Sequence, residues 1–105
     1  MEHAAVLDLG VSQLPSWLFV LVHLTAIAVA GWLASRAFAR GPSVLGAAFV
    51  VYGVGEVLYI GYHVGVTTFL LSHTLAEVAN LVAFVLAGVA FGLHVAEKRA
   101  APAAA

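Results

Sequence analysis

Three long apolar segments dominate the chain, and they constrain its fold more than any other feature. Of the 105 residues, 64% are hydrophobic and only 9% are charged, so a domain of this size cannot present a polar exterior to water. Each segment is long enough to cross a hydrocarbon core of about 30 Å as a helix. The sequence therefore predicts an all-α fold, an integral membrane protein with three transmembrane helices.

Proline, glycine and charged residues set the boundaries of these segments. Pro15 suits the first turn of a helix, where its missing N–H is not needed. Arg40, Gly41 and Pro42 separate the first segment from the second, and Glu97 follows the third. We expect a single membrane domain over residues 1–105, with spans at about 15–39, 43–65 and 68–96 and a disordered tail at 97–105.

The start of the third helix has two interpretations. Thr74 and Glu77 form a T-x-x-E pattern typical of a capping box, which would begin the helix at Leu75. Alternatively Thr67 or Thr68 caps a longer helix that projects beyond the membrane. We favour the longer helix, because the apolar residues at 69–71 would make a poor aqueous loop.

The basic residues indicate an orientation. All of them lie at the end where the first and third spans finish, whereas Glu2 and Asp8 lie at the opposite end. The positive-inside rule then places the N-terminus outside and the C-terminus in the cytoplasm of a multi-pass cell-membrane protein. Residues 2–12 are expected to rest on the outer surface. The basic residues are Arg36, Arg40, Lys98 and Arg99.

A carboxylate in the middle of the second span is the main functional signal. Glu56 is expensive to place in hydrocarbon, and such residues usually mark functional sites. Tyr52, Glu56, Tyr59 and His63 follow a 4-3-4 spacing, which puts them within an arc of about 60° on one helix face. Glu56 can be satisfied by its neighbouring tyrosines or by His23 of the first span.

Histidines and carboxylates from all three spans fall in the outer leaflet under this topology. Imidazole nitrogen and carboxylate oxygen without thiolate suit a transition metal such as Zn, Cu, Fe or Mn. His73 and Glu77 are four residues apart and share a helix face with Asn80 and two phenylalanines. The candidate metal ligands are His23, Glu56, His63, His73 and Glu77.

Other functions fit the same residues. His23 and His73 could bind haem or chlorophyll axially, as in an accessory subunit of a respiratory or photosynthetic complex. Glu56, Glu77 and His23 could form a short proton relay. The polar residues could also serve only to lock the helices together, with Glu77 as a helix cap. Glycine and alanine repeats such as Gly61-x-x-x-Gly65 favour a homo-oligomer or a subunit of a larger membrane complex.

Several classes of function lack a sequence signal. The chain has no cysteine, which removes thiolate metal sites and iron–sulfur clusters. Its net charge of −1 and four basic residues give no basic patch, so nucleic acid is not an expected partner. We find no nucleophilic triad and no phosphate-binding glycine loop, and therefore predict no catalytic residues. The lipid bilayer is the one partner that composition itself implies.

Overall fold

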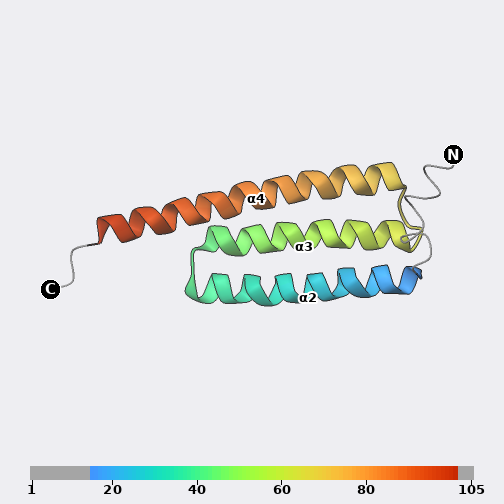
Figure 1. The fold of residues 1–105 in the computed structure, drawn as a ribbon, viewed down its shortest axis with the longest axis horizontal. Coiled ribbons are helices and arrows are strands. Elements are labelled where there is room, and N and C mark those ends of the chain that lie inside the picture. The colour runs from blue at the N-terminus through green and yellow to red at the C-terminus, as the bar shows by residue number, and fades with distance from the viewer. Residues whose placement is uncertain (1–14, 102–105) are drawn as a thin grey trace, which may run out of the picture.

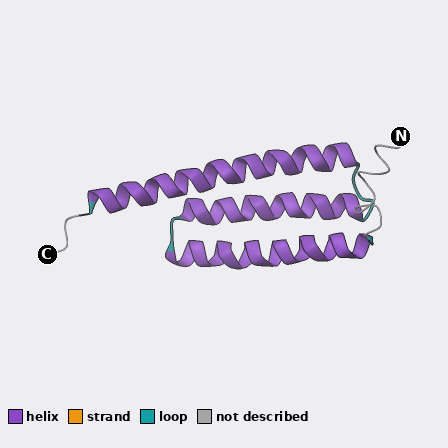
Figure 2. Cartoon of the chain, in the orientation of Figure 1, coloured by secondary structure: helices purple, strands orange, loops and turns teal. Residues whose placement is uncertain are grey.

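The computed structural model describes residues 15–101, and this part of the chain folds into three long helices without a strand. Helix α2 covers Ser16–Arg40, α3 covers Ser43–His63 and α4 covers Phe69–Ala100 (Figure 1). Each is long and apolar enough to cross a membrane. The prediction of an all-α protein with three membrane-spanning helices is confirmed, and short connections join the helices (Figure 2).

Proline precedes each of the first two helices. Pro15 and Pro42 are the N-cap residues of α2 and α3, both with extended backbone angles. Proline has no N–H to donate, so it fits a place where the first N–H groups of a helix lack partners within the helix. At the other end of α2, the N–H of Gly41 donates to the carbonyl of Ala37 at 2.8 Å. The link between α2 and α3 is therefore only Gly41 and Pro42.

A tight turn joins α3 to α4. Gly65 has a φ of 81°, a left-handed conformation that glycine adopts without steric penalty. The N–H of Val66 donates to the carbonyl of Gly61 at 2.8 Å, which closes the end of α3. The side chain of Thr68 then accepts from the N–H of Leu71 and caps α4. The longer third helix is thus confirmed, and the alternative start at Leu75, with Glu77 as a cap, is wrong.

The C-terminal end of α4 differs from the prediction. The helix continues through Glu97, Lys98 and Arg99 to Ala100, so the predicted disorder from residue 97 is wrong for these residues. Hydropathy falls at Glu97, but alanine, glutamate, lysine and arginine are strong helix formers. Their propensity extends the helix after the apolar segment has ended. The remaining predictions for residues 2–12 and 102–105 lie outside the described part of the chain.

The helices form a single layer with α3 in the middle. α3 packs against both α2 and α4, while α2 and α4 do not contact one another within residues 15–101 (Figure 1). With 32 residues, α4 is about 48 Å long, whereas the 21 residues of α3 span about 31 Å. The excess length of α4 projects past the α2–α3 link (Figure 1).

Small side chains fill both helix interfaces. Such residues let helix backbones approach closely, which is how helices associate in lipid. A Cβ atom added at Gly55 would lie 3.4 Å from the Cβ of Ala79, so α3 and α4 are in close contact there. The buried residues are Ala30, Ala34, Ala37, Gly46, Ala48, Gly55, Glu56, Ser72, Ala76, Ala83 and Ala90.

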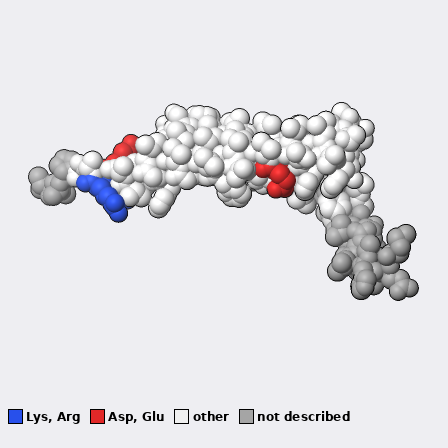
Figure 3. Space-filling view, turned by 90° about the horizontal axis from the view of Figure 1, so that it is seen from above, with Lys and Arg blue, Asp and Glu red and all other residues white. Residues whose placement is uncertain are grey.

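The large apolar side chains face outward. Trp17, Leu70 and Phe84 are 65%, 74% and 76% exposed, respectively, and many valines and leucines are similar. In water such a surface would aggregate, whereas in a bilayer it contacts lipid chains. The space-filling view shows a long surface with few charged side chains, and its lysine and arginine atoms lie only near the end where α4 projects (Figure 3). The apolar surface of the three helices is thus suited to contact with lipid chains.

Candidate functional site

The predicted polar face of α3 lies between its two neighbouring helices. Because α3 is the central helix, side chains on this face reach α2 on one side and α4 on the other. Glu56 and His63 contact residues of α2, whereas Tyr59 reaches both α2 and α4. The 4-3-4 spacing therefore placed these residues on a shared face, and the single-layer fold decided which helix each one meets.

His23 and Glu56 form the central contact of the site. Nδ1 of His23 lies 2.5 Å from Oε2 of Glu56, and their side chains are 17% and 10% exposed. Each residue is seven positions from the end of its helix that lies near the α3–α4 turn, which places the pair about 10 Å inside that end. With Nδ1–H donated to the carboxylate, the second ring nitrogen, Nε2, keeps its lone pair. This nitrogen can accept a proton or bind a metal.

Aromatic rings enclose His23 on both sides. Its ring stacks with Tyr59 at a centroid distance of 5.2 Å and with His63 at 5.3 Å, at interplanar angles of 15° and 26°. His63 stacks in turn with Phe19 at 5.1 Å. Residues of α2 and α3 thus alternate in one stack, from Tyr59 through His23 and His63 to Phe19. The stack fixes the position of the His23 ring and leads toward the end of the bundle where α3 joins α4.

A second series of rings connects this stack to α4. The ring of Tyr62 lies 5.3 Å from His63 and 5.3 Å from Phe69, and Phe69 stacks with His73 at 5.1 Å. His73 is exposed at the beginning of α4. His63 and His73, predicted site residues of the second and third spans, are therefore joined through aromatic contacts at the α3–α4 turn.

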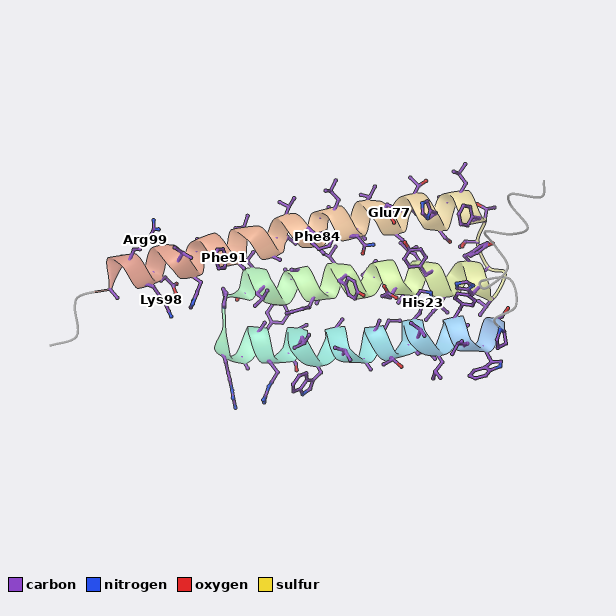
Figure 4. All side chains as sticks on the ribbon, in the orientation of Figure 1. His23, Glu77, Phe84, Phe91, Lys98 and Arg99 are labelled. Atoms are coloured by element: carbon purple, nitrogen blue, oxygen red, sulfur yellow. The ribbon has the colours of Figure 1, made fainter. Side chains whose placement is uncertain are left out.

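Glu77 has a different partner from the one its sequence position suggested. The hydroxyl of Tyr59 donates to Oε1 of Glu77 at 3.1 Å, linking α3 to α4. Glu77 is exposed on the surface of α4, near the level of His23 on the far side of α3 (Figure 4). Glu56 thus bonds to α2, whereas Glu77 bonds to α3.

Asn80 is the one side chain in residues 15–101 with a buried polar atom that lacks a hydrogen-bond partner. Its Oδ1 lies where a Cβ atom on Gly55 would come within 3.4 Å of it. Asn80 also lines an apolar groove of about 550 Å³ that runs over α3 between α2 and α4. Tyr52 borders the same groove from α3. An orphaned acceptor in an apolar span marks a place where a donor is missing.

The five predicted metal ligands do not all come together. His23, Glu56 and His63 gather between α2 and α3, Glu77 bonds to Tyr59, and His73 stacks on Phe69. No three histidine, aspartate or glutamate side chains in the described part of the chain are arranged to hold one metal ion. The stacking explains this, because the nitrogen lone pairs of stacked rings lie in parallel planes and do not converge on one point. His23 and His73 lie on helices that do not contact each other.

Two contacts were absent from the sequence analysis. Phe19, the ring at the outer end of the stack, is four residues before His23 and therefore on the same helix face. This spacing could therefore have predicted that Phe19 belongs to the stack. The hydrogen bond between Tyr59 and Glu77 had no such signal, because it depends on how α4 is rotated against α3.

Comparison of the chain with protein-family models, with curated proteins and with solved structures finds no match. The site must therefore be interpreted from its own geometry.

Proposed function

We propose that this chain is a small multi-pass protein of the cell membrane whose His23–Glu56 pair binds and releases a proton in the outer leaflet. The observation that carries the proposal is the 2.5 Å contact between Nδ1 of His23 and Oε2 of Glu56 inside two apolar spans. With Glu56 ionised and His23 neutral, the pair carries one negative charge. A proton on Nε2 converts it to an imidazolium–carboxylate pair with no net charge, which hydrocarbon tolerates better than a lone ion.

The surroundings of the pair support proton exchange with one side of the membrane. His63 stacks on His23 and is the last residue of α3, so a second imidazole lies between the pair and the outer end. Toward the opposite end, the faces of α2 and α4 continue as alanines. The proton therefore enters and leaves through the same leaflet. The distribution of basic residues supports an outer N-terminus and a cytoplasmic C-terminus.

Nitrogen-15 NMR of histidine-labelled protein in bilayers tests the proposal. The resonance of His23 Nε2, assigned by its loss in His23→Gln, should move from the unprotonated to the protonated position as the pH is lowered. In Glu56→Gln this change should be lost over the same pH range, because the protonated ring would be an unpaired cation in an apolar span. Glu77→Gln is the matched control and should behave like the wild type.

The result that would contradict the proposal is an Nε2 resonance that stays unchanged at every pH at which the protein remains helical. In that case the pair serves only to lock α2 against α3. A loss of response in Glu77→Gln equal to that in Glu56→Gln would also contradict it, because the proton would then not belong to the His23–Glu56 pair.

A second candidate is ligation of a transition metal, or of haem or chlorophyll, through Nε2 of His23. The observation in its favour is the carboxylate on Nδ1, since metal-bound histidines usually donate their other N–H to such a group. Glu56 then orients the ligand and is not itself a ligand. Elemental analysis and an absorption spectrum of the protein purified from its membrane distinguish the candidates. Metal or pigment lost in His23→Gln but kept in His73→Gln would support ligation by His23.

We further propose that the chain works as an oligomer or within a larger membrane complex. Glu77 is exposed on an apolar helix, where a carboxylate facing lipid is unfavourable. A second copy or a partner subunit packed over Glu77 and the 76% exposed Phe84 would remove both from lipid. Cross-linking between cysteines placed at Phe84 in two copies tests the oligomer. Cross-links at Leu21, on the outer face of α2, provide the control.

A further inference from the structure

A cavity lies at the end opposite the His23–Glu56 pair. It has a volume of about 770 Å³ and opens between the α2–α3 link and the projecting end of α4. The cavity lies where α4 continues beyond the end of α3 (Figure 1). The lining residues are Arg40, Gly41, Pro42, Leu45, Ala87, Ala90, Phe91, Leu93, His94 and Glu97.

The cleft has an apolar inner part and a polar rim. Leu45 and Ala87 lie nearest the middle of the bundle and are apolar, with Phe91 one turn of α4 further out. Arg40 and His94 line the part nearest the end of the bundle and can donate hydrogen bonds. An apolar inner part with a polar rim fits an amphiphile whose chain points into the bilayer and whose headgroup stays at its surface.

Charge favours an anionic headgroup. In the described residues this end carries Arg36, Arg40, Lys98 and Arg99 against Glu97, so four positive charges outnumber one negative charge. Lys98 and Arg99 lie at the far end of α4 (Figure 4). The ion pair that residues 15–101 contain is that of His23 with Glu56, so the guanidinium of Arg40 is not neutralised within this part of the chain.

Arg36 provides a natural comparison with Arg40. The two arginines are one turn apart on the same helix, but Arg36 is not among the lining residues of the cleft. Its guanidinium carbon lies 5.1 Å from the centroid of the Trp32 ring, in a cation–π contact. Arg40 therefore belongs to the lining of the cleft, and Arg36 does not.

We propose that the cleft binds an anionic phospholipid, with the phosphate against Arg40 and an acyl chain along Leu45 and Phe91. Basic pockets between transmembrane helices at a membrane surface bind such headgroups. Glu97, at the rim, opposes the phosphate and keeps the site from binding too tightly. This inference is independent of the His23–Glu56 proton site, which lies at the other end of the bundle.

Lipid exchange measured by native mass spectrometry of the full chain tests the site. Phosphatidylglycerol should bind the wild-type protein in preference to phosphatidylcholine. Arg40→Gln should weaken the binding of phosphatidylglycerol about fivefold, the factor that corresponds to about 1 kcal/mol per basic residue at a membrane surface. Glu97→Gln should strengthen it, because a negative charge is removed from the rim.

Arg36→Gln is the matched control, since it removes the same charge from the same helix outside the cleft. Equal weakening by Arg36→Gln and Arg40→Gln would overturn the proposal, because the attraction would then come from the general surface charge. Equal binding of phosphatidylglycerol and phosphatidylcholine would also overturn it. Circular dichroism of each variant checks that the helices are intact, which is expected because Arg40 is exposed at the end of α2.

Discussion

Within residues 15–101, ionisable side chains are paired at one end of the bundle and unpaired at the other. At the end where a tight turn joins α3 to α4, His23 is paired with Glu56, Glu77 accepts from Tyr59, and four rings stack between α2 and α3. At the other end, Arg40 and Glu97 stand apart around an open cleft.

The depth of these groups in the bilayer explains the difference. The His23–Glu56 pair lies about 10 Å inside the helix ends, where no water is present to solvate an unpaired group. An ionisable residue at the centre of a membrane helix costs about 2.5–3.5 kcal/mol on insertion scales, so a partner is needed. At the projecting end of α4, water and headgroups can solvate single charges. Ionisable groups deep in the bilayer are thus paired, whereas groups near its surface can stay unpaired around an open cleft.

Removing one member of the paired end should have the largest effect. Glu56→Leu leaves His23 without its partner and should lower the free energy of unfolding by about 3 kcal/mol, the upper end of the cost of an unsatisfied buried polar group. Unfolding in mixed micelles, followed by circular dichroism, measures this loss. Glu97→Leu is the control from the open end and should change the free energy of unfolding by less than about 0.5 kcal/mol.

The double variant His23→Leu/Glu56→Leu separates pairing from packing. It should recover most of the stability lost in Glu56→Leu, because neither polar group is then left alone in hydrocarbon. If the double variant is as unstable as the single one, the pair contributes through shape and not through charge.

A bulky residue in the close contact between α3 and α4 should have the next largest effect. A Cβ at Gly55 would already meet Ala79, Asn80 and Ala76 within 3.5 Å. Gly55→Leu should therefore lower the free energy of unfolding by about 1–3 kcal/mol and move α3 away from α4. Distances between spin labels on the two helices measure the movement. Gly92→Leu, where a Cβ meets nothing within 4 Å, should leave both quantities unchanged.

Loss of one hydroxyl should have the smallest effect. Tyr59→Phe removes the donor to Glu77 but keeps the ring that stacks on His23. Hydrogen bonds between membrane helices contribute about 0.6 kcal/mol on average, and we expect a loss of that size in the free energy of unfolding. Tyr62→Phe is the control, because in residues 15–101 its contacts involve the ring alone. An equal or larger loss in Tyr62→Phe would show that the effect of Tyr59→Phe does not come from the hydrogen bond to Glu77.

The sequence predicted the helices well because hydropathy and local signals determine them. The apolar segments predicted the three spans. Thr67 or Thr68 was expected to cap the long third helix, and the structure has Thr68 as the cap. The end of α4 was placed too early because hydropathy falls at Glu97 while helix propensity remains high to Ala100. Hydropathy reports where a chain enters lipid, whereas propensity reports where a helix ends, and the two differ here.

The sequence predicted which residues belong to the site but not which of them contact each other. Helical spacing placed Glu56, Tyr59 and His63 on one face, and topology placed His23 near their depth. Which carboxylate meets which partner depends on the rotation of α2 and α4 about their own axes, and short connections do not fix that rotation. Glu77 therefore bonds Tyr59 on α3, a result that only the assembled helices reveal.

The position of α3 between two helices that do not touch has a mechanical consequence. Glu56 contacts His23 of α2, and Tyr59 donates a hydrogen bond to Glu77 of α4. Glu56 and Tyr59 are three positions apart on one continuous helix, α3. A rotation of α3 that lengthens one contact must displace the other as well. A proton arriving at His23 and a partner pressing on Glu77 would therefore act on the same rotation. The position of α3 would thus couple the contact at His23 to the contact at Glu77.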